Sequence, residues 1–143
     1  MPSMPRFSDT DTARNRVTQA FRVQSYDVGA AGLANDAAYQ RWWATLREAL
    51  IAQALPGLPG APMLVTTRAH YWHPLRVSDA FTGHIWLSSL GKARWTMQLK
   101  LVAGDRAIAT ATHIGHFLDP ETLAPHPLPD TILQHYWETQ WQQ

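Results

Sequence analysis

The chain reads Tyr26-Asp-Val-Gly-Ala-Ala-Gly-Leu-Ala-Asn-Asp-Ala-Ala-Tyr-Gln-Arg-Trp-Trp43 at the point that decides its fold. Small residues and two glycines over the segment 28–32 indicate a loop. Asn35 or Asp36 is a suitable N-cap, because its side-chain oxygen can accept a hydrogen bond from a free amide of the first helical turn. The stretch therefore predicts a loop that leads directly into a capped helix.

The helix that follows is amphipathic. One stripe collects its apolar residues, which are Tyr39, Trp42, Trp43, Leu46, Ala49 and Leu50. The polar residues fall mostly on the other side, and these are Gln40, Arg41, Arg47 and Glu48. A breaker cluster, Leu55-Pro-Gly-Leu-Pro-Gly-Ala-Pro62, marks the end. The pattern predicts a helix from Asp36 to Ala54, about four to five turns long, with one buried face.

Outside the helix the apolar residues alternate with polar ones, as they do in strands. The expected strands are 21–25 before the helix and 64–72, 81–88, 94–101 and 107–117 after it, the last four in a meander. A short helix is expected over 131–140. One long helix and one sheet must bury each other's apolar faces. The sequence thus predicts an α+β domain in which one long helix packs on an antiparallel five-stranded sheet.

Length and composition bound the class of protein. The 143 residues suit a single domain over 17–143, after a polar tail over 1–16 that we expect to be mobile. A net charge of +1 with scattered basic residues gives no reason to expect nucleic acid. The tail has no secretory signal and no apolar run spans a membrane, so a cytoplasmic protein is expected. Seven Trp beside only 16% charged residues favour a homo-oligomer, either a dimer or a tetramer.

Several short motifs occur in the order found in one known family. Gly32, Asn35, Tyr39 and Trp42 have its spacing around the helix start. They are followed by Tyr71-Trp-His-Pro-Leu-Arg-Val-Ser-Asp79, Leu90-Gly-Lys-Ala-Arg-Trp-Thr96 and Leu118-Asp-Pro-Glu-Thr. Over residues 20–130 the chain resembles the hot-dog-fold acyl-CoA thioesterases of the 4-hydroxybenzoyl-CoA thioesterase family. The resemblance implies a hot-dog fold and hydrolysis of an acyl-CoA or acyl-carrier-protein thioester.

The chain also departs from that family. Gly29 stands where many members carry a catalytic aspartate, Leu33 stands where His is common, and Ser78 replaces a Gly. Two alternatives to hydrolysis therefore stay open. One is a non-catalytic protein that binds acyl thioesters, and the other is a hot-dog enzyme of different chemistry in a biosynthetic pathway.

The resemblance and the residue types together nominate a site. Thioester hydrolysis needs donors that polarise the carbonyl and a base that activates water. Amides near Asp36 and Ala37 are candidates for the first role, and the carboxylate of Asp36 or Asp27 for the second. Expected substrate-binding residues are Gly32, Asn35, Ala37, Tyr39, Lys92 and Arg94. Each has an ordinary structural interpretation: Asp36 as N-cap, Asp27 as a turn residue, Asn35 as a local loop residue, Tyr39 as core, and the basic residues as solvated surface.

No metal or cofactor is expected. His70 and His73 are three apart on an expected strand, so their side chains point to opposite faces, and the same holds for His113 and His116. The chain has no Cys and no HExxH spacing. It has no phosphate-binding glycine loop for ATP or NAD and no GxSxG motif for a serine hydrolase.

Overall fold

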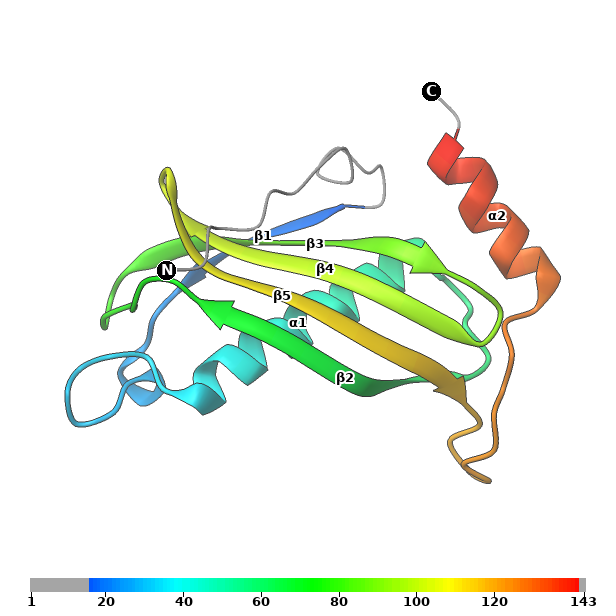
Figure 1. Ribbon diagram of the computed structural model, residues 1–143, viewed down its shortest axis with the longest axis horizontal. Coiled ribbons are helices and arrows are strands. Elements are labelled where there is room, and N and C mark those ends of the chain that lie inside the picture. The colour runs from blue at the N-terminus through cyan, green and yellow to red at the C-terminus, as the bar shows by residue number, and fades with distance from the viewer. Residues whose placement is uncertain (1–15, 142–143) are drawn as a thin grey trace.

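The computed structural model describes residues 16–141 and confirms the expected fold class, with a long helix packed on a five-stranded antiparallel sheet (Figure 1). Apart from Arg16, the expected mobile tail lies outside the described residues. The elements are β1 (Val17–Arg22), the 3-10 helix η2 (Ser25–Asp27), α1 (Asp36–Ala54), β2 (Ala61–Tyr71), β3 (Ala80–Leu90), β4 (Arg94–Ala103), β5 (Arg106–Leu118) and α2 (Asp130–Trp141). No helix within 16–141 is both long and apolar enough to cross a membrane.

The strand order is β1-β3-β4-β5-β2, and every neighbouring pair is antiparallel. The meander is confirmed for β3, β4 and β5 but is wrong for β2, which pairs with β5 at the far edge of the sheet. Phe21 of β1 pairs with Phe81, so β1 occupies the position beside β3. Alternation of side chains identifies a strand, but it carries no information on which strand lies beside it.

Helix α1 has the bounds that its sequence predicts, and Asn35 is its N-cap. The helix buries Ala38, Tyr39, Trp42, Trp43, Leu46, Leu50 and Ala54. Leu46 reaches Gly83 of β3, where an added Cβ would lie 2.9 Å from the leucine Cδ1. The glycine therefore allows the helix to approach the sheet closely.

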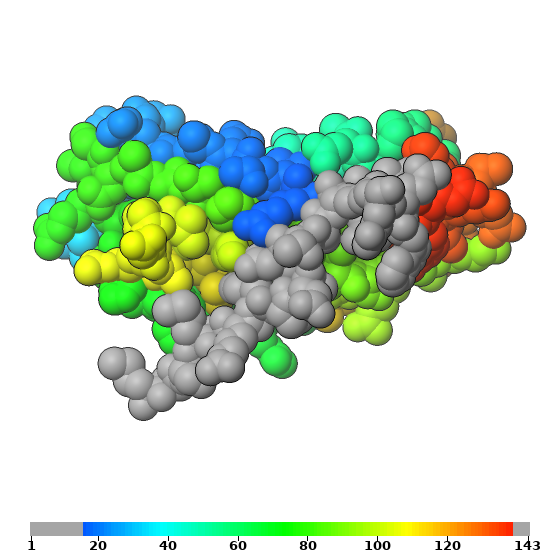
Figure 2. All heavy atoms as spheres, turned by 90° about the horizontal axis from the view of Figure 1, so that it is seen from above, coloured from blue at the N-terminus to red at the C-terminus, as the bar shows by residue number. Residues whose placement is uncertain are grey.

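The position of α1 over the sheet defines where a ligand can bind. The helix packs mainly against β1 and β3, whereas most residues of β2 stay exposed. The start of α1 lies at the same end of the sheet as the end of β2, and α2 lies at the opposite end (Figures 1 and 2). The side of α1 that faces β2 is consequently the less crowded side, and one cavity lies beside the first turn of the helix and another beside its C-terminal half.

Candidate active site

A cavity of about 350 Å³ lies at the start of α1. It is lined by Leu33, Ala34, Asp36, Tyr39, Tyr71, Trp72, His73 and Pro74. The loop before α1, the first turn of the helix and the segment that ends β2 all contribute. The cavity therefore brings together the loop and helix start nominated from the sequence with a segment some 35 residues away in the chain.

Backbone hydrogen bonds hold this loop against the segment after β2. The amide of Ala34 donates to the carbonyl of Leu75 over 2.8 Å, and Leu33 forms an isolated bridge with Arg76. Gly32 has a φ of 76°, in the left-handed region that favours glycine. This expected substrate-binding residue thus shapes the turn of the loop, and it does not line the cavity.

The first turn of α1 presents unpaired backbone donors. Asn35 Oδ1 accepts from the amide of Ala38 at 2.9 Å, so Asn35 is the cap and the interpretation of Asp36 as the cap is wrong. Among the described residues, the amides of Asp36 and Ala37 have no recorded hydrogen-bond partner. Asp36 is the first helical residue, is exposed, and lines the cavity. A carboxylate and free amides therefore lie side by side at the positive end of the helix dipole.

Tyr39 forms part of the cavity wall and is almost fully buried. Its ring meets that of Tyr71 edge to face, with centroids 4.7 Å apart. Burial raises the pKa of the Tyr39 hydroxyl, and the neighbouring Tyr71 and Asp36 add to this effect, while a backbone hydrogen bond from Leu75 opposes it. The hydroxyl therefore stays protonated at neutral pH, which suits a hydrogen-bond donor or a rigid wall.

Asp27, the other carboxylate nominated as base, has both oxygens engaged. Its Oδ1 accepts from the Arg41 guanidinium at 2.5 Å, and its Oδ2 accepts from the amide of Gln24 at 2.8 Å. Its backbone carbonyl also accepts from the amide of Asn35. The residue is only 2% exposed. These contacts tie the end of η2 to the body of α1 and leave the carboxylate outside the cavity lining.

Lys92 and Arg94 lie at the other end of the sheet from Asp36. Arg94 pairs with His116, whereas Tyr71 at the cavity pairs with Ala109, seven residues earlier on β5. That separation corresponds to about 23 Å along the strands. Lys92 forms an ion pair with Asp130 of α2 at 2.6 Å. A single subunit thus does not bring these two residues to the helix start.

The sequence interpretation did not nominate the aromatic and imidazole groups at the end of β2. Tyr71 and His73 line the cavity. The signal in the sequence was that both lie within three residues before Pro74, which marks the end of the strand. Their proximity to Asp36 depends on long-range pairing, which the local pattern does not contain.

A second polar feature lies deeper, between α1 and the sheet. Arg47 was expected on the polar side of the helix, but it is half-buried, and its Nη1 lies 2.9 Å from Nδ1 of the fully buried His113. Arginine only donates, so Nδ1 accepts and the imidazole proton sits on Nε2. Burial, followed by the charge of Arg47, lowers the pKa of His113 to about 4. The imidazole is therefore neutral in the folded protein at neutral pH.

This low pKa predicts a specific pH dependence of stability. The unfolded chain binds a proton at His113 below its ordinary pKa of 6.5, whereas the folded protein resists it down to about pH 4. Stability should fall by up to about 3 kcal/mol as the pH drops through that window. Denaturant unfolding at several pH values measures the free energy of unfolding. The wild type should show this fall in stability at low pH, and His113→Gln should not. The exposed His116 on the same strand supplies the control, and His116→Gln should keep the wild-type dependence.

Within residues 16–141, no group of three or more His, Asp or Glu side chains is placed to hold a metal ion. The polar groups at the cavity include the Asp36 carboxylate, the His73 imidazole and the Tyr39 hydroxyl.

Sequence comparison assigns the family. Residues 5–135 match the pattern of the thioesterase-like superfamily, which covers most of the chain, and the chain belongs to that superfamily. The resemblance drawn from the motifs is thereby confirmed. A comparison with functionally curated proteins gives no significant match.

Solved structures share the fold. A 1,4-dihydroxy-2-naphthoyl-CoA thioesterase from Synechocystis superposes with a TM-score of 0.73 at 14% identity, covering 86% of this chain and 96% of that one. The BH1999 gentisyl-coenzyme A thioesterase superposes with a TM-score of 0.71 at 17% identity, covering 84% of this chain and 99% of that one. A hypothetical protein from Staphylococcus aureus in complex with CoA superposes with a TM-score of 0.74 at 17% identity, covering 88% of this chain and 86% of that one. At these identities the similarity establishes the hot-dog fold.

Proposed function

We propose that the protein hydrolyses acyl-CoA thioesters in the cavity at the start of α1, with Asp36 as general base. The observation that carries the proposal is an exposed carboxylate in the cavity wall, Asp36, next to two unpaired amides of the first helical turn. Ala37, whose amide is one of the two, does not itself line the cavity. Membership of the thioesterase-like superfamily supports the reaction class. Among the similar structures, one is a complex with CoA and two are named CoA thioesterases, which supports CoA as the carrier of the acyl group.

The chemistry follows from the geometry of the helix start. Asp36 takes a proton from water, and the resulting hydroxide attacks the thioester carbonyl carbon. The amides of Asp36 and Ala37 donate to the carbonyl oxygen as it gains negative charge. The tetrahedral intermediate then breaks its C–S bond, and the thiolate takes the proton held by Asp36. The products are a free acid and the CoA thiol.

Asp36 is the better candidate base because its carboxylate is accessible. Asp27 pairs with Arg41 and accepts from the amide of Gln24, and it is buried outside the cavity lining, where water has little access to it. His73 lines the same cavity and is the next candidate. The side-chain oxygen of Asn35 accepts the capping hydrogen bond from the amide of Ala38. Its side-chain nitrogen remains as a potential donor to the substrate.

The direct test measures thiol release from a panel of aliphatic and aromatic acyl-CoAs. We expect turnover of at least one class, at rates below those of enzymes with a loop carboxylate, because Gly29 supplies none. Acyl-carrier-protein thioesters in the same assay identify the carrier. No thiol release from any member of the panel would refute hydrolysis as the function.

The non-catalytic alternative has its own support, namely the absence of a carboxylate at Gly29. If the protein binds acyl-CoA without cleaving it, then Gly29→Asp is the decisive variant. An added Cβ at Gly29 has no atom within 4 Å, so the substitution fits without displacing neighbours. Thiol release gained by this variant would assign the lost base to the loop.

We further propose that two copies of the chain pair through β2. This strand is 11 residues long, lies at the edge of the sheet, and exposes Met63 and Val65 by 47% and 50%. Natural proteins rarely leave a long apolar edge strand uncovered. A symmetric dimer joins identical surfaces, so the two edge strands would run antiparallel. This pairing would place the start of the partner's α1 near the first residues of β2.

The dimer predicts a selective effect of charge on β2. Val65→Lys should raise the dimer dissociation constant at least about tenfold, because a lysine on the edge must be desolvated on pairing. Val77→Lys provides the matched control, since Val77 is similarly exposed at 45% but lies outside β2. Sedimentation velocity over a concentration series measures both. A monomeric wild type at micromolar concentration, or equal effects of the two variants, would contradict the proposed interface.

A further inference from the structure

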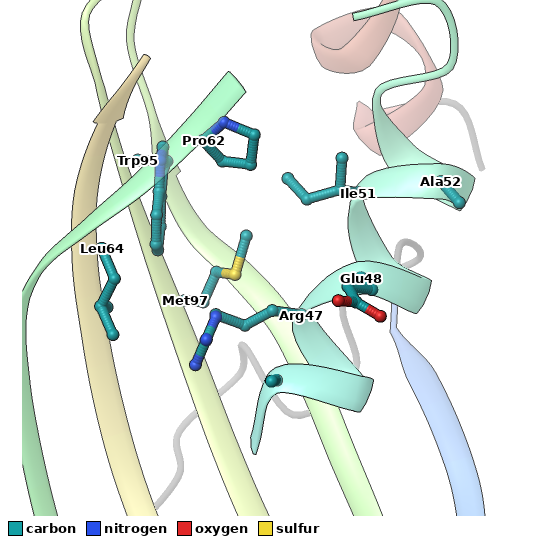
Figure 3. Close-up of a pocket in the computed structure, with 9 residues that line it drawn as sticks. Arg47, Glu48, Ile51, Ala52, Pro62, Leu64, Trp95 and Met97 are labelled. Atoms are coloured by element: carbon teal, nitrogen blue, oxygen red, sulfur yellow. The ribbon is translucent and has the colours of Figure 1, made fainter. Parts of the chain in front are cut away.

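A second cavity, of about 440 Å³, lies between the C-terminal half of α1 and the strands (Figure 3). Its lining consists of Ala44, Arg47, Glu48, Ile51, Ala52, Pro62, Leu64, Trp95 and Met97. Most of these side chains are apolar, and the volume falls within the range of small-molecule sites. The cavity is therefore suited to a hydrocarbon chain or ring.

One cation interrupts the apolar lining. Figure 3 shows the Arg47 side chain extending from α1 toward the strands, while Glu48 lies farther from them. Burial lowers the pKa of the Arg47 guanidinium, and the nearby charge of Glu48 opposes that effect. Adjacent helical residues point in different directions, which keeps these two side chains from pairing closely.

Within residues 16–141, the Arg47 guanidinium has no anionic side chain at ion-pair distance. It takes part neither in the ion pair of Arg41 with Asp27 nor in that of Lys92 with Asp130. Its recorded hydrogen bond goes to the neutral His113. This bond fixes the guanidinium in place and uses one of its five N–H donors. Half-burial removes part of the hydration of this cation, so an anion that pairs with its remaining donors would be bound favourably.

We propose that this cavity binds the far end of the acyl group and that this end carries a carboxylate, which pairs with Arg47. The inference rests on the proposed thioester hydrolysis and names its substrate class, an acyl-CoA derived from a dicarboxylic acid. The planar guanidinium matches a carboxylate with two parallel hydrogen bonds. The apolar walls formed by Ile51, Leu64 and Met97 hold the carbons between the two ends.

The proposed dimer connects this cavity to the reacting carbonyl. Within one subunit Arg47 follows Asp36 by 11 residues, which is about 16 Å along the helix axis. Antiparallel pairing of β2 strands would bring the start of the partner's α1 near Pro62 and Leu64, which line this cavity. The acyl group would then run from the helix start of one subunit into the cavity of the other.

The test compares acyl-CoAs of equal chain length with and without the terminal carboxylate. Adipyl-CoA and hexanoyl-CoA form one pair, and suberyl-CoA and octanoyl-CoA form another. Wild type should favour the carboxylate member of at least one pair by about 10- to 100-fold in kcat/KM, the range of a hydrogen-bonded charge. Arg47→Met should remove that preference, chiefly by raising KM for the carboxylate substrate. Arg106→Met, at an exposed strand start away from the cavity, should retain it.

Binding measured apart from turnover separates this inference from the proposed function. Calorimetry with the same CoA pairs, on the Asp36→Asn background, should show the same preference even if no thioester is hydrolysed. Arg47→Lys keeps the positive charge but lacks the planar guanidinium, so it should retain only part of the preference for the carboxylate substrate. This variant also serves as the test if Arg47→Met does not fold. Equal binding of both pair members by wild type would overturn the inference. Dissociation of the dimer by Arg47→Met would also overturn it, because Arg47 would then serve the interface.

Discussion

Asp36→Asn should lower kcat for thioester hydrolysis by about 10²–10⁴-fold, the contribution of a positioned general base. KM should change less, because the carboxylate acts on the water mainly in the transition state. Asparagine preserves the shape of the first helical turn and leaves the amides of Asp36 and Ala37 in place. Some activity above background should therefore remain. Steady-state kinetics with the best acyl-CoA of the panel measures both parameters.

Two further variants identify the base if it is another residue. Asp27→Asn should reduce stability through loss of the Arg41 pair while changing kcat by less than about threefold, far below the range of a general base. His73→Gln tests the imidazole in the same cavity. A large fall in kcat in either variant, together with an active Asp36→Asn, would transfer the role of base to that residue.

The sequence predicted the long helix well because its signals are local. A capping residue and the proline-rich cluster after Leu55 fix its two ends within a few residues of chain. Strand pairing is different in kind. Nothing near β2 indicates that it lies beside β5, because that choice follows from how α1 covers β1 and β3.

The candidate site shows the same difference between local features, which the sequence predicts, and long-range contacts, which it does not. The loop and helix start were recognisable from the sequence, but the distinction between Asn35 as cap and Asp36 as free carboxylate needed the backbone geometry. His73 joins Asp36 only through pairing of the loop with residues after β2. Arg47 was misplaced because a long basic side chain can run along apolar surface from a position near the edge of the helical stripe.

Leu46→Ala should destabilise the protein by about 2–5 kcal/mol, the cost of removing a fully buried leucine that leaves a cavity. Leu46 is fully buried and lies midway along α1, where its side chain meets Gly83 and fills the space between helix and sheet. The closeness of that contact limits how far the helix can collapse onto the sheet, which favours the upper part of the range. Chemical denaturation monitored by tryptophan fluorescence gives the free energy of unfolding.

A leucine on the surface supplies the control for this core substitution. Leu123 is 70% exposed, so Leu123→Ala should change the unfolding free energy by no more than about 0.5 kcal/mol. A loss below about 1 kcal/mol in Leu46→Ala would mean that the helix does not bury this stripe against the sheet. The position of Asp36 depends on the same packing, since the first turn of α1 is rigidly continuous with the turn that carries Leu46. A core variant that folds but lets the helix shift should therefore also lose kcat, although it touches no atom of the proposed site.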